Sequence, residues 1–139
     1  MFKSALAAAA AASLLSILAG CETNPFAKAD PPQPVAVMQP AFPMNGLLTT
    51  PGGMTLYTFD KDTANAGTSA CTGPCATLWP PFAAAADAAP IGNFTVVKRE
   101  DGGQQWAYKG WPLYTYSKDM RNGETSGNNF KNAWHVIKP

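Results

Sequence analysis

The sequence predicts a mainly β fold, a small antiparallel β domain built from two related repeats with short irregular or helical connectors. The first observation is an internal repeat, because residues 53–62 recur as residues 110–119 with six of ten positions identical, at an offset of 57. The second is the alternation of aromatic residues with their neighbours over residues 56–61, a period of two that is typical of strands. The third is proline, which limits the alanine-rich stretch 83–89 to a short helical turn.

The repeat extends beyond the two matched segments. Each copy is followed by an asparagine and a glycine, and it ends on a tryptophan, Trp79 in the first copy and Trp134 in the second. Repeats of about this length are supersecondary units that pack on each other. We therefore expect one domain over residues 44–139, with repeat 1 at about 44–82 and repeat 2 at about 94–139.

Two hairpins and two further strands are expected inside this domain. Short turns that contain glycine, between segments of alternating residues, favour hairpins. One hairpin is expected between residues 47–50 and 54–59, and the other between residues 94–99 and 104–108. The remaining strands are expected at residues 112–116 and 134–137.

The amino-terminal residues have the pattern of a bacterial lipoprotein signal peptide. Lys3 supplies a positive charge, residues 5–17 form an apolar run, and residues 18–20 form a cleavage site directly before Cys21. The run is shorter than the about 20 residues that a membrane span needs. We expect residues 1–20 to be removed and Cys21 to carry lipid, which would hold the protein on a membrane.

The lipid predicts a location in the cell envelope. Glu22 stands after the lipidated cysteine, where aspartate favours the inner membrane, so in a Gram-negative host we expect the outer membrane, facing the periplasm. Residues 21–43 contain six prolines and are expected to form an extended tether, of which residues 35–38 could be a first edge strand. Without the leader, basic and acidic residues are equal in number, which argues against a nucleic-acid partner.

Cys71 and Cys75 remain once Cys21 is assigned to the lipid. Two cysteines in an oxidising compartment are expected to form a disulfide, and Gly73 and Pro74 favour the tight turn that it needs. The alternative is a redox-active dithiol. Thioredoxin-type motifs have two residues between the cysteines, whereas three stand here, so a structural disulfide is favoured.

A doubled tyrosine motif gives the sequence a family resemblance. Each copy has a tyrosine, a second aromatic residue two positions on and an aspartate three positions later, and a Trp-Pro-Pro segment follows the cysteine pair. The chain resembles the bacterial lipoproteins with a Yx(FWY)xxD motif, a secreted-repeat family of unknown function, over most of residues 44–139. The resemblance implies a secreted or lipid-anchored repeat protein and implies no activity. The motif residues are Tyr57, Phe59, Asp62, Tyr114, Tyr116 and Asp119.

The two motif aspartates are expected to have a structural role. Each lies where a strand ends and a glycine-containing loop begins, and a carboxylate there can accept hydrogen bonds from backbone N–H groups two or three residues on. The alternative is a cation such as calcium, bound by Asp60, Asp62 and Asn65. This set lacks the closing glutamate of a calcium loop, so the structural role is favoured.

No catalytic or metal-ligating set can be assembled from the other residues, and no cofactor is expected. His135 is the only histidine, and copper could use it only with Met38, Met44, Met54 or Met120, which form no spaced cluster. No nucleophile–histidine–acid set, phosphate loop or zinc spacing is present. The aromatic residues of repeat 2 could form an exposed platform, but filling of a small core is favoured. They are Tyr108, Trp111, Tyr114, Tyr116 and Trp134.

These observations favour a lipid-anchored envelope protein that is not an enzyme and serves as a binding or structural module. Its expected partners are the membrane, through the lipid, and an envelope protein or glycan. The alternative is a thiol–disulfide or electron-transfer protein that uses Cys71 and Cys75, and a metal-binding module comes third.

A Cys71→Ser/Cys75→Ser variant separates the first two hypotheses. A structural disulfide restricts the unfolded chain, so its loss should lower the free energy of unfolding by about 2 kcal/mol for so short a loop. The variant should still complement a deletion strain. Denaturation curves and complementation measure these two outcomes. A variant that stays folded and fails to complement would establish the redox hypothesis instead.

Overall fold

The structure, a computed structural model, describes residues 38–139. The expected signal peptide, the lipid site Cys21 and most of the tether lie outside these residues. No helix in the described part is long and apolar enough to cross a membrane. The elements are β1 (Phe42–Met44), β2 (Leu47–Thr49), β3 (Tyr57–Phe59), α1 (Pro74–Leu78), β4 (Phe94–Lys98), β5 (Gln104–Tyr108), β6 (Trp111–Pro112), the 3-10 helix η1 (Phe130–Asn132) and β7 (Trp134–Val136).

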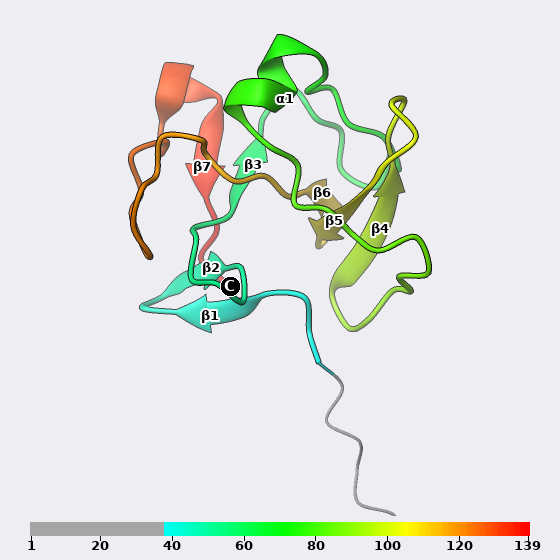
Figure 1. The fold of residues 1–139 in the computed structure, drawn as a ribbon, viewed down its shortest axis with the longest axis horizontal. Coiled ribbons are helices and arrows are strands. Elements are labelled where there is room, and N and C mark those ends of the chain that lie inside the picture. Colours follow the sequence, from blue (N-terminus) through cyan, green and yellow to red (C-terminus); the bar gives the residue numbers. More distant parts are fainter. Residues whose placement is uncertain (1–37) are drawn as a thin grey trace, which may run out of the picture. The chain divides into compact units, whose positions relative to one another are not determined.

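The strands form small antiparallel sheets, as Figure 1 shows. β1 pairs with β2, β3 pairs with β7, and β4, β5 and β6 form a three-stranded sheet in that order. The expected mainly β, antiparallel fold is confirmed. The hairpin expected between residues 94–99 and 104–108 is also present, with Phe94 opposite Tyr108 and Lys98 opposite Gln104.

The other expected hairpin is wrong in its main pairing. β2 pairs with β1, and β3 pairs with β7, so that Phe59 lies opposite Trp134. Only the turn end of the hairpin is present: Thr49 bridges to Thr55, the Thr50 N–H donates to the Met54 carbonyl (2.9 Å), and the Leu56 N–H donates to the Leu48 carbonyl (3.0 Å). The reason is that β3 finds its partner at the far end of the chain, since burial of aromatic side chains favours that longer-range pairing.

Two further expectations differ from the structure in the connectors. The short helix is α1, which begins at Pro74. In the stretch 83–89 the Ala84 N–H donates to the Gln104 carbonyl (2.9 Å) alongside β5, and the expected helical turn is limited to one bond from the Ala88 N–H to the Ala85 carbonyl (3.0 Å). Proline suits a first helical turn because its missing N–H has no partner there in any case. The expected strand 112–116 is only β6, because the Thr115 N–H donates to the Pro80 carbonyl instead (2.9 Å).

β1 lies partly inside the segment 21–43 that the sequence assigns to the tether. It contains Pro43, which has no N–H to donate. Because β1 is an edge strand of a two-stranded sheet, the missing donor breaks no ladder on its outer side.

An approximate twofold axis relates the two repeats. The Tyr57 N–H donates to the Tyr114 carbonyl (2.8 Å), and the Tyr114 N–H donates to the Tyr57 carbonyl (3.0 Å). A second pair of backbone bonds follows the same symmetry. The Asp60 N–H donates to the Ala133 carbonyl (2.8 Å), and the Ser117 N–H donates to the Leu78 carbonyl (3.0 Å). The strand residues at the offset of 57 therefore occupy equivalent positions, and at the ends of the repeats Leu78 corresponds to Ala133.

Four aromatic rings form the centre of the main core, and we call them the ring row. Phe59 stacks on Trp134 (centroids 4.2 Å apart), Trp134 on Trp79 (3.8 Å) and Trp79 on Tyr116 (4.3 Å). The rings come alternately from repeat 1 and repeat 2. Of the expected aromatic platform, the residues Tyr114, Tyr116 and Trp134 are buried, and Tyr108 and Trp111 are half-buried.

A smaller core cluster lies around two equivalent leucines. Leu56 and Leu113 are both fully buried, and they pack with Leu48, Phe94 and Ala41. Leu56 also donates its N–H to the Leu48 carbonyl (3.0 Å), which joins the amino-terminal sheet to the repeats.

Each repeat places an asparagine against a glycine of the other. Gly53 and Gly110 both have φ +86°, a left-handed conformation that suits glycine. A Cβ on Gly110 would lie 2.6 Å from the amide carbon of Asn65, and a Cβ on Gly53 would lie 2.8 Å from that of Asn122. No side chain fits at either contact.

Gly110→Ala should therefore lower the free energy of unfolding by more than the about 1–2 kcal/mol that a left-handed backbone alone costs. Gly67→Ala is the matched control, because Gly67 has φ +68° with open space around its Cβ position. The double variant Asn65→Gly/Gly110→Ala should recover the difference, because glycine removes the contacting amide and tolerates the φ of +61° at residue 65. Urea denaturation measures all three variants. Equal losses in Gly110→Ala and Gly67→Ala would show that the asparagine contact has no effect.

Candidate functional site

The two copies of the motif exchange hydrogen bonds across the twofold axis. The Tyr57 hydroxyl donates to Oδ2 of Asp119 (2.6 Å), and the Tyr114 hydroxyl donates to Oδ2 of Asp62 (2.7 Å). Both tyrosines are fully buried, and both aspartates are nearly so. Each motif is thus completed by the aspartate of the other repeat.

The second oxygen of each aspartate fixes the loop that follows it. Oδ1 of Asp62 accepts from the Ala70 N–H (2.7 Å), and Oδ1 of Asp119 accepts from the Ser126 N–H (2.9 Å). These donors lie farther along the chain than the two or three residues that an Asx-turn would give. The carboxylates therefore close wide loops, and they do so in both repeats.

Burial sets the protonation of these groups. It raises the pKa of Tyr57 and of Tyr114 well above the usual value of a phenol, and the neighbouring carboxylates raise both pKa values further. Burial also raises the pKa of Asp62, against the lowering effect of the Ala70 N–H and the Tyr114 hydroxyl. Both tyrosine hydroxyls consequently keep their protons and act as donors.

Arg99 fixes the loop of repeat 1, and no sequence pattern singles it out. Its side chain is almost fully buried. It donates to Ser69 Oγ (3.0 Å), to Gln105 Oε1 (2.8 Å) and to the Cys71 carbonyl (2.9 Å). Ser69 Oγ in turn lies 2.6 Å from the Tyr114 hydroxyl, so the arginine is linked to the motif.

The Cys71–Cys75 disulfide is present. Cys71 is fully buried beside Arg99, whereas Cys75 is half-buried on α1. No cysteine stands at the equivalent place in repeat 2, where η1 carries Phe130 and Lys131. The two repeats therefore differ most at the segments that precede Trp79 and Trp134.

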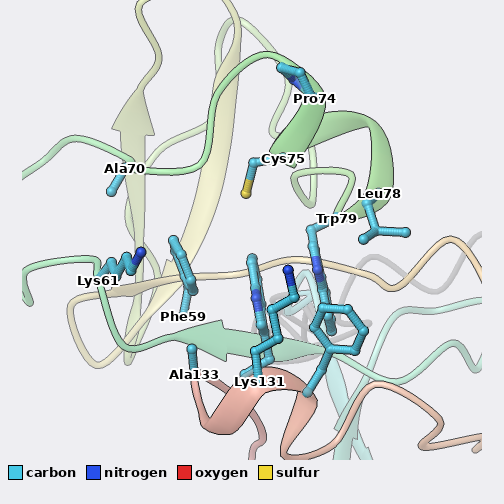
Figure 2. Close-up of a pocket in the computed structure, with 11 residues that line it drawn as sticks. Phe59, Lys61, Ala70, Pro74, Cys75, Leu78, Trp79, Lys131 and Ala133 are labelled. Carbon is cyan, nitrogen blue, oxygen red and sulfur yellow. The ribbon is translucent and has the colours of Figure 1, made fainter.

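These two differing segments enclose a pocket of about 530 Å³. It lies along the ring row, with α1 on one side and η1 on the other (Figure 2). Figure 2 shows Lys61 beside Phe59, Leu78 beside Trp79, and the Cys75 sulfur turned toward the rings. The pocket is lined by Phe59, Lys61, Ala70, Pro74, Cys75, Leu78, Trp79, Phe130, Lys131, Ala133 and Trp134.

In the structure the candidate calcium and copper ligands contact other protein groups. Asp60 Oδ2 lies 2.9 Å from His135 Nε2, Asp62 binds Tyr114 and Ala70, and Asn65 packs on Gly110. Within residues 38–139 no group of three or more His, Cys, Asp or Glu residues could hold a metal ion. Of the methionines considered with His135, Met38 and Met120 are largely exposed.

Both halves of the chain match the same family model. Residues 45–83 and residues 95–138 each match a secreted repeat of unknown function, and together they cover more than half of the chain. The chain belongs to the secreted-repeat lipoprotein family. The resemblance carried by the doubled tyrosine motif is thus confirmed, and family membership implies that this lipoprotein lies outside the cytoplasm. No curated protein and no solved structure matches this secreted-repeat lipoprotein.

Removal of either motif hydroxyl should destabilise the lipoprotein. We expect Tyr57→Phe and Tyr114→Phe each to lower the free energy of unfolding by about 1–3 kcal/mol, because a buried carboxylate loses its donor. Tyr114→Phe should cost at least as much as Tyr57→Phe, since the second partner of the Tyr114 hydroxyl, Ser69 Oγ, lies at 2.6 Å, whereas that of the Tyr57 hydroxyl, the Glu124 carbonyl, lies at 3.5 Å.

Urea denaturation of these variants is compared with that of Tyr108→Phe. Tyr108 is half-buried on β5, and its hydroxyl bonds to no other described residue, so its loss should change stability by less than about 0.5 kcal/mol. A result in which all three variants behave alike would contradict the structural role of the exchange.

Proposed function

We propose that this protein is a non-enzymatic binding module, held at the membrane surface by lipid on Cys21, and that its pocket takes a small, largely apolar ligand. The pocket along the ring row is the observation that carries the proposal. Its volume of about 530 Å³ is in the range of sites for small molecules.

The composition of the lining supports binding of an apolar molecule. Nine of the eleven lining residues are apolar, aromatic or a disulfide-bonded cysteine, and the other two are lysines. Such surface contributes roughly 25 cal/mol for each Å² that a ligand removes from water. The rings are also held rigidly by stacking, so little side-chain entropy is lost when a ligand binds.

The chemistry of the lining supports binding rather than catalysis. The lining contains no hydroxyl, free thiol, carboxylate or histidine, and its two lysines are exposed, without the desolvated setting that activates a lysine as a nucleophile. The His135–Asp60 pair is partly exposed and is not part of the lining. The buried motif carboxylates are occupied by the tyrosine hydroxyls and loop N–H groups.

One observation favours a second candidate, the thiol–disulfide function. Cys75 forms part of the pocket wall, whereas Cys71 is fully buried. A thiol partner would therefore reach the disulfide from the pocket and attack the Cys75 sulfur. The double serine variant described above tests this candidate.

The neutral dye N-phenyl-1-naphthylamine tests the proposed pocket. The protein is the chain from residue 21 onward with Cys21→Ser, so that no lipid competes for the dye. Ligands of this size gain about 0.3 kcal/mol per heavy atom, which predicts a Kd on the order of 0.1 mM. Fluorescence titration should show saturable binding.

Ala70→Phe should block this binding, because Ala70 lines the pocket and its side chain is exposed. Ala86→Phe is the matched control, since Ala86 is exposed and lies outside the lining. Thermal unfolding confirms that both variants fold. Binding that is absent in the parent protein, or is unaffected by Ala70→Phe, would overturn the proposal.

A further inference from the structure

The polar side-chain groups of the pocket are all hydrogen-bond donors. They are the ammonium groups of Lys61 and Lys131 and the indole N–H groups of Trp79 and Trp134. Ammonium and indole groups donate and cannot accept. The lining has no carboxylate, carboxamide or hydroxyl side chain, so its side chains favour a ligand that carries hydrogen-bond acceptors and negative charge.

The ring row also favours a ligand with electron-rich or negatively charged groups. Trp134 is covered on both faces, by Phe59 and Trp79, and Trp79 is covered by Trp134 and Tyr116. A ligand in the pocket can therefore touch these two tryptophans only at their edges. The edge of an aromatic ring is positive and its face negative, so edges favour an electron-rich group and disfavour a cation.

Neighbouring carboxylates do not neutralise the two lysines. Asp60 faces His135, while Asp62 and Asp119 are bound by tyrosine hydroxyls of the motif. No ion pair joins Lys61 or Lys131 to an acidic residue in the part of the chain that the structure describes. The charge of the pocket is therefore positive, in a chain whose net charge is only +1.

We propose that the ligand is a small amphiphilic organic anion, with its apolar part along the ring row and its anionic group between Lys61 and Lys131. This inference rests on the proposed function, because it names the chemical class that the same pocket accepts. The pocket volume sets the size of the ligand to that of a small molecule.

A pair of dyes tests the charge separately from the pocket. 1-Anilinonaphthalene-8-sulfonate has the ring system of N-phenyl-1-naphthylamine with an added sulfonate, so the ratio of the two affinities reports the contribution of the negative charge. The protein is again the chain from residue 21 with Cys21→Ser. Comparison of this ratio between variants removes the intrinsic difference between the dyes.

Lys61→Gln/Lys131→Gln should reduce the affinity for the sulfonate dye by about three- to tenfold relative to the affinity for the neutral dye, as expected for two exposed charge pairs. Lys118→Gln is the matched control, because Lys118 is the counterpart of Lys61 in repeat 2 and lies outside the lining. The preference of the parent protein for the sulfonate should also fall in 1 M salt, where screening acts within about 3 Å.

The experiment separates failure of the anion inference from failure of the proposed function. If the ratio of affinities is the same in the parent protein and in the double lysine variant, the anion inference is overturned while the pocket stands. If neither dye binds, or Ala70→Phe leaves both unaffected, the proposed function fails and the anion inference fails with it. Loss of the preference in Lys118→Gln as well would also overturn the assignment to Lys61 and Lys131.

Discussion

Two buried hydrogen bonds, from Tyr57 to Asp119 and from Tyr114 to Asp62, cross between the repeats in opposite directions. Each repeat supplies the donor of one bond and the acceptor of the other. Buried polar groups need partners, so neither repeat can satisfy its own motif. The loops that the aspartates close lead to Trp79 and Trp134, and the position of the ring row therefore depends on this exchange.

The two repeats are related by symmetry, but the pocket between them is not symmetric. Both repeats have the tyrosine, the aspartate and the tryptophan, but only repeat 1 has the disulfide, and only its loop is bound by Arg99. In the corresponding part of repeat 2, η1 supplies an aromatic ring and a lysine. The pocket lies between these two segments. Its lining therefore combines residues that have a counterpart in the other repeat, such as Lys61 and the two tryptophans, with residues of α1 and η1 that have none.

The sequence alone predicts the fold class, the two copies and the hairpin 94–108, because each depends on alternation, on repetition or on a nearby turn. The pairing of β3 with β7 cannot be predicted in this way, since no local pattern shows which distant strand forms the backbone hydrogen bonds of β3. Arg99 is one arginine near a hairpin turn, and its partners converge only after folding. Alternation already placed Phe59 and Lys61 on one face, but their common pocket also requires η1.

The reciprocal motif has a consequence for chains of other lengths. A polypeptide with one copy would contain a tyrosine without its carboxylate, an aspartate without its phenol and half of the ring row. Such a chain would complete its core by association with a second copy of itself, and the Tyr–Asp bonds would then form between subunits. In the present chain residues 84–94 join the two copies, so the same association is intramolecular, and the two copies can supply different walls of one pocket.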